Sequence, residues 1–284
     1  MYCRFLTTMA LIAAWLPAMA WADWSKVEQV TRGIERDLEA RVGVALLAPN
    51  GDLAWSYQGE QRFALTSTFK SLLCAQLLAS PNMNKQEVTV KQTDIVSYAP
   101  VMKERVGATM ALPELCAITL ATSDNSAANL VLDALGGPPA LTEFLRQQGD
   151  DITRLDRRET QLNSAIPGDE RDTTTPIAIS KTLHRLLVAE GLPKAAQQQL
   201  RSWMQNNQVA DGLLRKVLPK GWQIADRSGA GGHGARAITA LVWPPGVEQP
   251  WVIAIYMAET EASFDDRNAA IASIGQQLFN QLLR

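Results

Sequence analysis

Residues 66–74 read Thr-Ser-Thr-Phe-Lys-Ser-Leu-Leu-Cys, with a serine and a lysine three apart at the start of an apolar run. Residues three apart on a helix share one face, so this spacing predicts that the Lys70 amine lies beside the Ser67 hydroxyl. A serine hydroxyl is a weak nucleophile unless a neighbouring base activates it. The unpaired N–H groups of a first helical turn also favour a developing negative charge. The pair therefore indicates a nucleophilic serine, although an exposed helix start carries the same spacing by chance.

The composition is that of a globular protein with almost balanced charge. The 284 residues include 27 Lys and Arg and 29 Asp and Glu, for a formal net charge of −2, and the calculated pI is about 5.8. Nothing in this balance indicates a nucleic-acid partner. The length suits one large domain or two lobes. His184 and His233 lie far apart without ligand spacing, so we expect no metal site and no cofactor.

The N-terminus has the features of a secretory signal. Arg4 precedes an apolar run over residues 5–16, and small residues follow at Ala18, Ala20 and Ala22. Such a segment is removed on export, and its apolar run is too short for a permanent membrane span. We therefore expect residues 1–22 to be a signal peptide and the mature protein to be soluble, periplasmic and monomeric.

Cys74 and Cys116 are the two cysteines that remain once Cys3 leaves with the signal. An oxidising compartment favours a disulfide between them, and two buried free thiols are the alternative. Cys74 lies seven residues after Ser67, and Cys116 lies seven residues before Ser123. A bridge would therefore tie together the helices that carry the two serines.

Predicted strands lie at both ends of the chain, and predicted helices fill the middle. The apolar periodicity gives strands at residues 42–48, 53–57, 223–228, 235–243 and 251–258. Besides the helix that begins near residue 67, it gives helices at residues 24–41, 112–122, 125–135, 139–148, 176–190, 193–206 and 265–283. The simplest fold is α+β: an antiparallel sheet built from both ends and covered by the terminal helices, with an all-helical lobe inserted. We assign residues 23–62 and 207–284 to the α/β lobe and residues 63–206 to the all-α lobe.

The tripeptide Ser123-Asp124-Asn125 lies between two of the predicted helices. A second hydroxyl near a nucleophilic serine can pass a proton to a leaving nitrogen. The same residue types form a common cluster at helix N-termini, which is the alternative interpretation.

A long polar segment at residues 150–175 carries Glu159 and Asn163. A structureless loop of this length in a compact protein is usually functional. A carboxylate and an amide four residues apart can hold one water between them, which suits hydrolysis of an ester; a solvated polar loop is the alternative. An ion pair between Arg157 and Asp172 would close the loop at its neck. Exposed, the pair would contribute little to stability, whereas breaking a buried pair would be costly.

The segment Arg227-Ser228-Gly229-Ala230 ends a predicted strand. An arginine can grip a carboxylate in two places, and the neighbouring hydroxyl adds a donor. Backbone N–H groups past the glycine can complete an oxyanion hole.

The motifs S-x-x-K, S-D-N, E-x-x-L-N and a basic-hydroxyl-Gly triplet, in this order, resemble those of the class A serine β-lactamases. The resemblance covers nearly all of the chain after the signal. It implies an α/β lobe and an all-α lobe with the active site between them. The implied activity is hydrolysis of the β-lactam amide of penicillins, which confers antibiotic resistance.

The resemblance also implies the catalytic roles. Ser67 is implied to be the acyl-enzyme nucleophile, with Lys70 and Glu159 as the base system. Which of these two bases starts acylation stays open, whereas Glu159 with a water carries deacylation. Ser123 is implied to pass a proton to the β-lactam nitrogen, and Asn163 to hold the water.

Substrate binding follows from the same resemblance. Asn125 is implied to bind the side-chain amide of the substrate, and the backbone N–H groups of Ser67 and Ala230 to form the oxyanion hole. The triplet Arg227-Ser228-Gly229 is implied to bind the substrate carboxylate, and Arg236 on the next strand to supplement it.

Two positions depart from the usual family pattern. The triplet is Arg-Ser-Gly at residues 227–229 where most members have Lys-Thr-Gly, which resembles the carbenicillin-hydrolysing branch. We therefore expect carboxypenicillins among the substrates. Thr160 follows the glutamate where many members have proline. The resemblance implies a cis peptide bond between Glu159 and Thr160 all the same.

Three other functions share part of this sequence pattern. Residues 229–234 match the G-x-G-x-x-G fingerprint of dinucleotide-binding proteins, which must open a helix after a strand. A strand is predicted to follow here, so we expect no dinucleotide. A penicillin-binding D,D-peptidase shares three of the motifs but lacks the loop with Glu159 and Asn163. A penicillin sensor that acylates without turnover is the third alternative.

Overall fold

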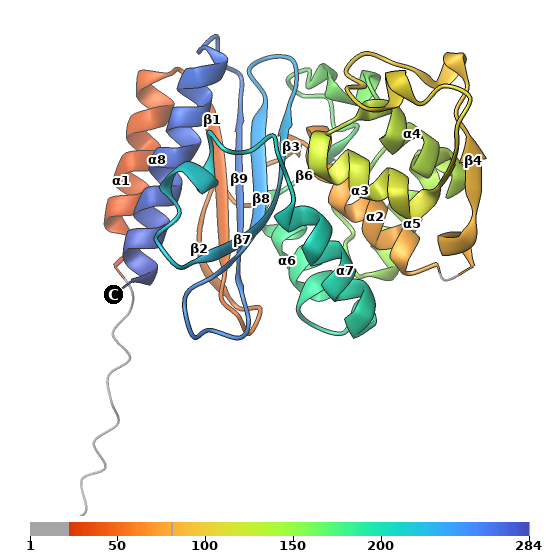
Figure 1. The fold of residues 1–284 in the computed structure, drawn as a ribbon. Coiled ribbons are helices and arrows are strands. Elements are labelled where there is room, and N and C mark those ends of the chain that lie inside the picture. The colour runs from red at the N-terminus through yellow and green to blue at the C-terminus, as the bar shows by residue number, and fades with distance from the viewer. Residues whose placement is uncertain (1–22, 81, 284) are drawn as a thin grey trace, which may run out of the picture.

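The computed structural model describes residues 23–80 and 82–283. Its centre is a five-stranded sheet in which every neighbouring pair is antiparallel. The strand order is β2-β1-β9-β8-β7, so strands from the two ends of the chain lie side by side (Figure 1). The strands are β1 (Arg41–Leu47), β2 (Leu53–Tyr57), β7 (Gln223–Ala230), β8 (Arg236–Trp243) and β9 (Trp251–Ala258).

Helices α1 (Ser25–Asp37) and α8 (Phe264–Leu282) cover one face of this sheet (Figure 1). Side chains of a strand point to opposite faces in turn, so alternate residues face these helices. On β9 these are Ile253, Ile255 and Met257, which lie in the outer core between the sheet and the two helices. The sheet is therefore the middle layer of three, with apolar side chains on both faces.

A lobe of six helices covers the other face and shares the inner core with the sheet (Figure 1). The helices are α2 (Phe69–Leu78), α3 (Leu112–Thr122), α4 (Asn125–Ala134), α5 (Gly137–Gln147), α6 (Pro176–Leu187) and α7 (Lys194–Gln205). Helix α2 is the centre of the lobe, because every residue from Phe69 to Leu77 is buried. A helix that is buried all round lies inside the protein instead of on its surface.

The α+β fold predicted from the sequence is confirmed, and most element bounds agree within three residues. The sequence did not predict two short antiparallel ladders. Strands β4 (Glu87–Thr89) and β5 (Thr109–Ala111) pair within the helical lobe, and β3 (Phe63–Ala64) pairs with β6 (Thr173–Thr174). The inserted lobe is thus not purely helical. The exact lobe boundaries at residues 62 and 206 stay a prediction.

The predicted disulfide is confirmed. Cys74 and Cys116 are bonded, with their Cα atoms 5.7 Å apart, and they join α2 to α3. The expected signal peptide at residues 1–22 lies outside the described residues. Within the part of the chain that is described, no helix combines the length and the apolar character that crossing a bilayer requires.

Candidate active site

Ser67 and Lys70 lie together at the start of the buried helix α2. Ser67 belongs to the 3-10 turn Thr66–Thr68 directly before α2, and Lys70 is in the first turn of that helix. The Lys70 Nζ donates to Ser67 Oγ over 2.9 Å, which is the contact that their spacing predicts. Ser67 is 7% exposed and Lys70 is fully buried. The hydroxyl therefore opens to solvent on one side and meets an amine on the other.

Lys70 is surrounded by oxygen atoms. Its Nζ lies 3.0 Å from Glu159 Oε1, 2.9 Å from the Ser123 carbonyl, 3.2 Å from Ser123 Oγ and 2.6 Å from Asn125 Oδ1. Burial lowers the pKa of Lys70 to about 8, and the Glu159 carboxylate partly offsets this fall. At pH 7 the group is thus an ammonium that a small change can deprotonate.

Ser123 is held in a strained conformation between α3 and α4. Its φ of 64° is in the left-handed region, which residues other than glycine rarely adopt. The neighbouring Asp124 holds the backbone in this conformation. Its side chain caps α4 by accepting from the Ala127 N–H, and it also accepts from the N–H of Met102. Ser123 Oγ lies 3.1 Å from Ser67 Oγ, so the two hydroxyls that the sequence singled out are neighbours.

Glu159 lies on the long loop, and its carboxylate faces the Ser67 hydroxyl. It is 3% exposed, and its Oε1 lies 3.5 Å from Ser67 Oγ. Asn129 holds the backbone of Glu159 by accepting from its N–H and donating to its carbonyl. The peptide bond between Glu159 and Thr160 is cis, as expected. Sequence reasoning missed Asn129, although its position four residues after Asn125 places both on one face of α4.

Asn163 lies beside this carboxylate. Its Nδ2 donates to Glu159 Oε2. Its buried Oδ1 has no hydrogen-bond partner within the part of the chain that the structure describes. The amide therefore contacts the carboxylate directly and keeps one free acceptor beside it.

The neck of the loop is closed by the ion pair that the sequence suggested. Arg157 Nε donates to Asp172 Oδ2 over 2.5 Å, and Asp172 is fully buried. The other oxygen of Asp172 accepts from the backbone N–H groups of Asp156 and Arg157. Because the pair is buried on the carboxylate side, breaking it would be costly.

The strand β7 lines the opposite side of the site. Arg227 is 1% exposed. Its Nε donates to the Ser67 carbonyl, its Nη1 to the Leu120 carbonyl and its Nη2 to Ser123 Oγ. Burial lowers the pKa of Arg227 to about 10, so the guanidinium stays charged at neutral pH. The neighbouring Asp226 pairs with Arg215. Within the described residues, Asp226 forms no ion pair with Arg227.

Glycine at position 229 lets β7 approach the nucleophile. A Cβ atom there would lie 2.0 Å from Thr66 Oγ1 and 2.7 Å from the Ser67 backbone nitrogen. The chain then turns into β8, which pairs antiparallel with β7. The strand that follows excludes the dinucleotide-binding interpretation of residues 229–234, as expected, because that motif must open a helix.

Arg236 begins β8 and faces the same pocket. Its Nε donates to Asn268 Oδ1 over 2.8 Å and its Nη1 to the Gly229 carbonyl over 2.9 Å. Burial lowers the pKa of Arg236 to about 10. Two arginines thus place positive charge at one end of the site.

These side chains line one pocket of about 290 Å³. Its lining comprises Ser67, Tyr98, Ser123, Asn125, Asn163, Val209, Arg227, Ser228, Gly229, Ala230, Arg236 and Phe264. Sequence reasoning missed Tyr98, Val209 and Phe264, which no local motif marks. The pocket brings together the hydroxyls, the amides and the arginines that the sequence singled out, and Lys70 and Glu159 lie directly behind Ser67.

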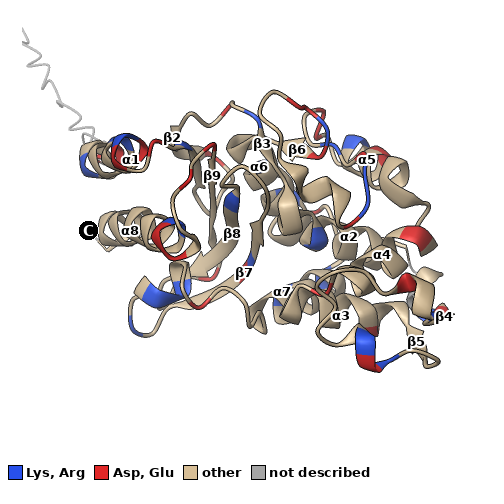
Figure 2. Ribbon diagram, turned by 90° about the horizontal axis from the view of Figure 1, so that it is seen from above, with Lys and Arg blue, Asp and Glu red and all other residues tan. Residues whose placement is uncertain are grey.

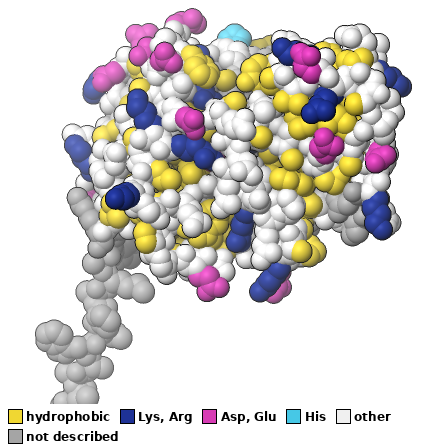
Figure 3. Space-filling view, in the orientation of Figure 1, with side chains coloured by type: hydrophobic (Ala, Val, Ile, Leu, Met, Phe, Trp, Pro, Cys, Tyr) yellow, Lys and Arg dark blue, Asp and Glu magenta, His cyan; other side chains and the backbone are white. Residues whose placement is uncertain are grey.

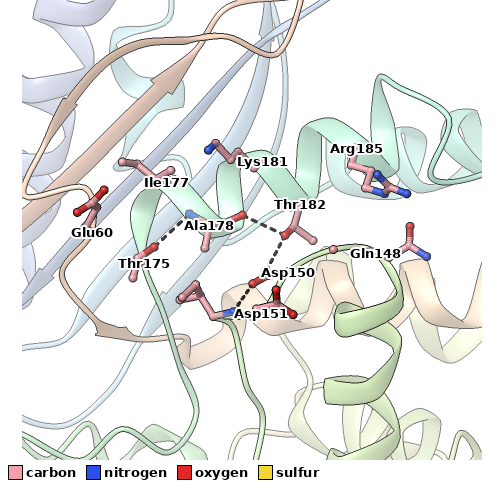
Figure 4. A pocket seen from close by; sticks show the side chains of 12 residues that line it. Glu60, Gln148, Asp150, Asp151, Thr175, Ile177, Ala178, Lys181, Thr182 and Arg185 are labelled. Atoms are coloured by element: carbon pink, nitrogen blue, oxygen red, sulfur yellow. Dashed lines mark hydrogen bonds between the residues drawn. The ribbon is translucent and has the colours of Figure 1, made fainter.

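A larger cavity of about 720 Å³ lies elsewhere, between residues 148–152 and the start of α6 (Figure 4). Glu60, Asp150 and Asp151 are among its lining residues. The Asp150 carboxylate already accepts hydrogen bonds from the Thr182 hydroxyl and from two backbone N–H groups. None of its lining residues belongs to the constellation around Ser67. We therefore take the smaller pocket as the candidate active site.

Charged and apolar side chains are mixed over the outside of the molecule. Acidic and basic residues are both scattered over the fold (Figure 2). On the visible face hydrophobic side chains are interspersed with charged ones (Figure 3). Within residues 23–80 and 82–283, no three His, Cys, Asp or Glu side chains cluster as metal ligands would.

Comparison with known proteins gives a consistent result. The model of the β-lactamase enzyme family matches residues 26–282. The chain is 48% identical to β-lactamase PSE-4 of Pseudomonas aeruginosa, over 98% of this chain and 97% of the relative. It is 40% identical to β-lactamase AER-1 of Aeromonas hydrophila, over 94% and 90%.

Solved structures agree with these relatives. The chromosome-encoded β-lactamase of Vibrio parahaemolyticus superposes with a TM-score of 0.87 at 42% identity, covering 90% of this chain and 98% of that one. An ancestral class A β-lactamase superposes with a TM-score of 0.86 at 42% identity, covering 89% and 99%.

Proposed function

The chain belongs to the class A β-lactamases, and from this premise we propose that it hydrolyses penicillins through an acyl-enzyme on Ser67. One observation carries the proposal: Ser67 Oγ lies 2.9 Å from Lys70 Nζ, 3.1 Å from Ser123 Oγ and 3.5 Å from Glu159 Oε1. A serine with a basic group, a proton relay and a second carboxylate within this reach suits nucleophilic catalysis.

Acylation opens the β-lactam ring. Ser67 Oγ attacks the lactam carbonyl carbon, and its proton passes to the base system. The C–N bond breaks as the ring nitrogen takes a proton from Ser123, and Ser123 is reprotonated by the base system through Lys70, 3.2 Å away. The oxyanion is stabilised by the backbone N–H groups of Ser67 and Ala230. Gly229 supports this role, because the close approach of β7 to the Ser67 backbone depends on the absence of a side chain.

Deacylation needs an activated water. Glu159 and Asn163 hold it, and the free Oδ1 of Asn163 beside the carboxylate is the observation that supports this. Glu159 takes a proton from the water as the water oxygen attacks the ester carbonyl carbon. The C–O bond to Ser67 then breaks. Serine recovers its proton, and the penicilloic acid leaves.

Substrate recognition uses both ends of the pocket. Asn125 Nδ2 already donates to the Ser97 carbonyl, and its second N–H is directed to the amide carbonyl of the substrate side chain. Arg227 and Ser228 bind the carboxylate that penicillins share, and Arg236 supplements them. The planar fork of Arg227 also supplies donors toward a side-chain carboxylate, so we include carboxypenicillins among the substrates.

The proposal extends to where the enzyme acts. Residues 1–22 direct export, so we place the mature enzyme in the periplasm. We propose that it acts there as a monomer. A membrane partner and a nucleic-acid partner have no part in this function.

The first test distinguishes turnover from simple acylation. Purified protein is mixed with a chromogenic cephalosporin, and steady turnover is expected. A single burst equal to the enzyme concentration would instead indicate a penicillin sensor or a D,D-peptidase.

The second test concerns Glu159. In Glu159→Ala the water loses its base, so deacylation stalls, whereas acylation is slowed and still proceeds with Lys70 as the remaining base. Mass spectrometry should therefore find a persistent penicilloyl adduct on Ser67 while turnover is lost. The control is Glu170→Ala, which removes an exposed carboxylate of the same loop and should turn over like the wild type. Normal turnover in Glu159→Ala would refute the assignment.

A further inference from the structure

Phe264 is an exposed aromatic ring that lines the candidate active-site pocket. It is the first residue of α8 and is 48% exposed, yet it lines the pocket together with Ser67 and Arg236. Single exposed apolar side chains are common and need no explanation by themselves. This ring differs because two guanidinium groups lie against it. The Arg236 Cζ is 4.7 Å from its centroid and the Arg267 Cζ is 5.6 Å away.

Arg236 is held by neutral groups alone. Asn268 and the Gly229 carbonyl accept from Nε and Nη1, and Phe264 covers the guanidinium. No carboxylate of the described residues pairs with Arg236, and its Nη2 makes no hydrogen bond to them. The charge is thus fixed in position without being neutralised. Such an arrangement keeps the group available for an anion that arrives from outside.

The Phe264 ring restrains the tilt of the Arg236 guanidinium, which the two hydrogen bonds do not. Both hydrogen bonds act within the plane of the guanidinium, whereas an aromatic ring within about 6 Å attracts the cation and limits its tilt. A carboxylate is recognised best by a planar fork of fixed orientation. The ring also keeps water from one side of the charge, which strengthens its interaction with an anion.

We propose that Phe264 is a positioning residue for the substrate carboxylate, acting through the orientation of the Arg236 guanidinium. The proposal rests on the proposed function and deepens it. Helix α8 thereby contributes to recognition through Phe264 and Asn268, which lie four residues apart and therefore on one helix face.

The test compares two substitutions of the ring. Phe264→Leu keeps an apolar side chain and removes the aromatic face, whereas Phe264→Tyr keeps the face. For benzylpenicillin, Phe264→Leu should raise KM about three- to tenfold with kcat nearly unchanged. Phe264→Tyr should restore the wild-type KM. Leu283→Ala, which trims another exposed apolar side chain at the far end of α8, is the matched control and should leave both constants unchanged.

A double-variant cycle identifies the route of the effect. If the ring acts through Arg236, Phe264→Leu should raise KM in the wild type and change it little in an Arg236→Ala background. Equal increases in both backgrounds would overturn the proposal, because the ring would then act on the substrate directly. An unchanged KM in Phe264→Leu, or a lower melting temperature alone, would also overturn it.

The two proposals fail in different ways. Wild-type protein that does not turn over penicillins would refute the proposed function. Normal wild-type turnover with the same KM in Phe264→Leu would refute only the role of the ring.

Discussion

Lys70 is a buried ammonium group. Burial disfavours its charge, whereas the oxygen atoms around it stabilise that charge. Burial lowers its pKa to about 8, while five oxygen atoms, one of them from Glu159, lie within reach of its three N–H donors. As an ammonium it donates to Ser67 Oγ and cannot take the proton from that hydroxyl. At neutral pH Glu159 is therefore the base that the geometry favours for acylation, with Lys70 as the cation that orients the serine.

The pH dependence of kcat/KM follows from this arrangement. Below about pH 8 Lys70 is protonated and the network is intact; above it the amine is neutral and the ion pair with Glu159 is lost. We expect kcat/KM for benzylpenicillin to fall with a midpoint near pH 8. The measurement is a set of initial rates at low substrate from pH 6 to about 10. A rise through this midpoint would contradict the expectation and make the neutral amine the acylating base.

Arg227 is a second residue whose exact chemistry matters. Its three nitrogens reach Ser67, Leu120 and Ser123, a fork that the single amine of lysine cannot reproduce. We expect Arg227→Lys to lower kcat/KM for carbenicillin more than for benzylpenicillin, by about three- to tenfold in the ratio. Steady-state kinetics with both substrates measure this. Equal losses for the two would show that the fork contributes nothing to the side-chain carboxylate.

At the residue scale, local sequence spacing predicted some residues of the site and missed others. Ser67 and Lys70 are three apart across the 3-10 turn and the first turn of α2, so their contact could be predicted. The spacing of Asn129 from Asn125 was a usable local signal as well. Tyr98 and Phe264 reach the site through the packing of separate elements, and nothing in their sequence neighbourhood distinguishes them from ordinary helix or loop residues. Arg236 was found only because the family resemblance pointed to it.

At the scale of elements, the loop that carries Glu159 depends on its neck. The Asp172 carboxylate is fully buried and accepts from Arg157 and two backbone N–H groups. Asp172→Asn keeps an acceptor and removes the charge, so we expect a loss of about 1–3 kcal/mol in local stability. Hydrogen exchange should show faster exchange of the loop amides while the sheet amides stay protected.

A matched control exists in the same loop. Arg171 pairs with Asp169 at 2.8 Å, but its side chain is 53% exposed. An exposed pair contributes about 0–1 kcal/mol, so Arg171→Gln should change loop exchange very little. Similar effects of the two substitutions would show that burial of the pair does not hold the neck.

Helices and long strands were predictable because they are several turns or several alternations long. The ladder of β4 and β5 has three residues in each strand, too few to establish a period of two. Its register depends on a partner about 22 residues away, as for Val88 and Met110 at the middle of the ladder. It also depends on packing that the sequence does not display. Local patterns therefore predicted the large elements and missed the small ones.

At the scale of the whole molecule, the disulfide ties two helices of the inner core. Cys74 and Cys116 are 42 residues apart, and a loop of this length corresponds to about 4 kcal/mol in the chain-entropy model. We expect reduction to lower the melting temperature by roughly 10 °C. Activity at 25 °C should be largely retained, because neither sulfur lines the pocket. Thermal unfolding with and without reductant measures the shift.

The control is the double variant Cys74→Ala/Cys116→Ala. It should melt at the temperature of the reduced wild type and show no further change with reductant. A wild-type melting temperature that reductant leaves unchanged would contradict the stabilising role of the bridge.

The sheet has a consequence for the making of the protein. Arg41 on β1 pairs with Ala258 on β9, so the two central strands are roughly 200 residues apart in the chain. At about 5–20 residues per second a ribosome finishes β9 roughly 10–40 s after β1. Through that interval β1 has no partner on its β9 side, and its apolar residues lack the outer core. The sheet therefore cannot close, and its outer core cannot form, until the last strand and the last helix have been made.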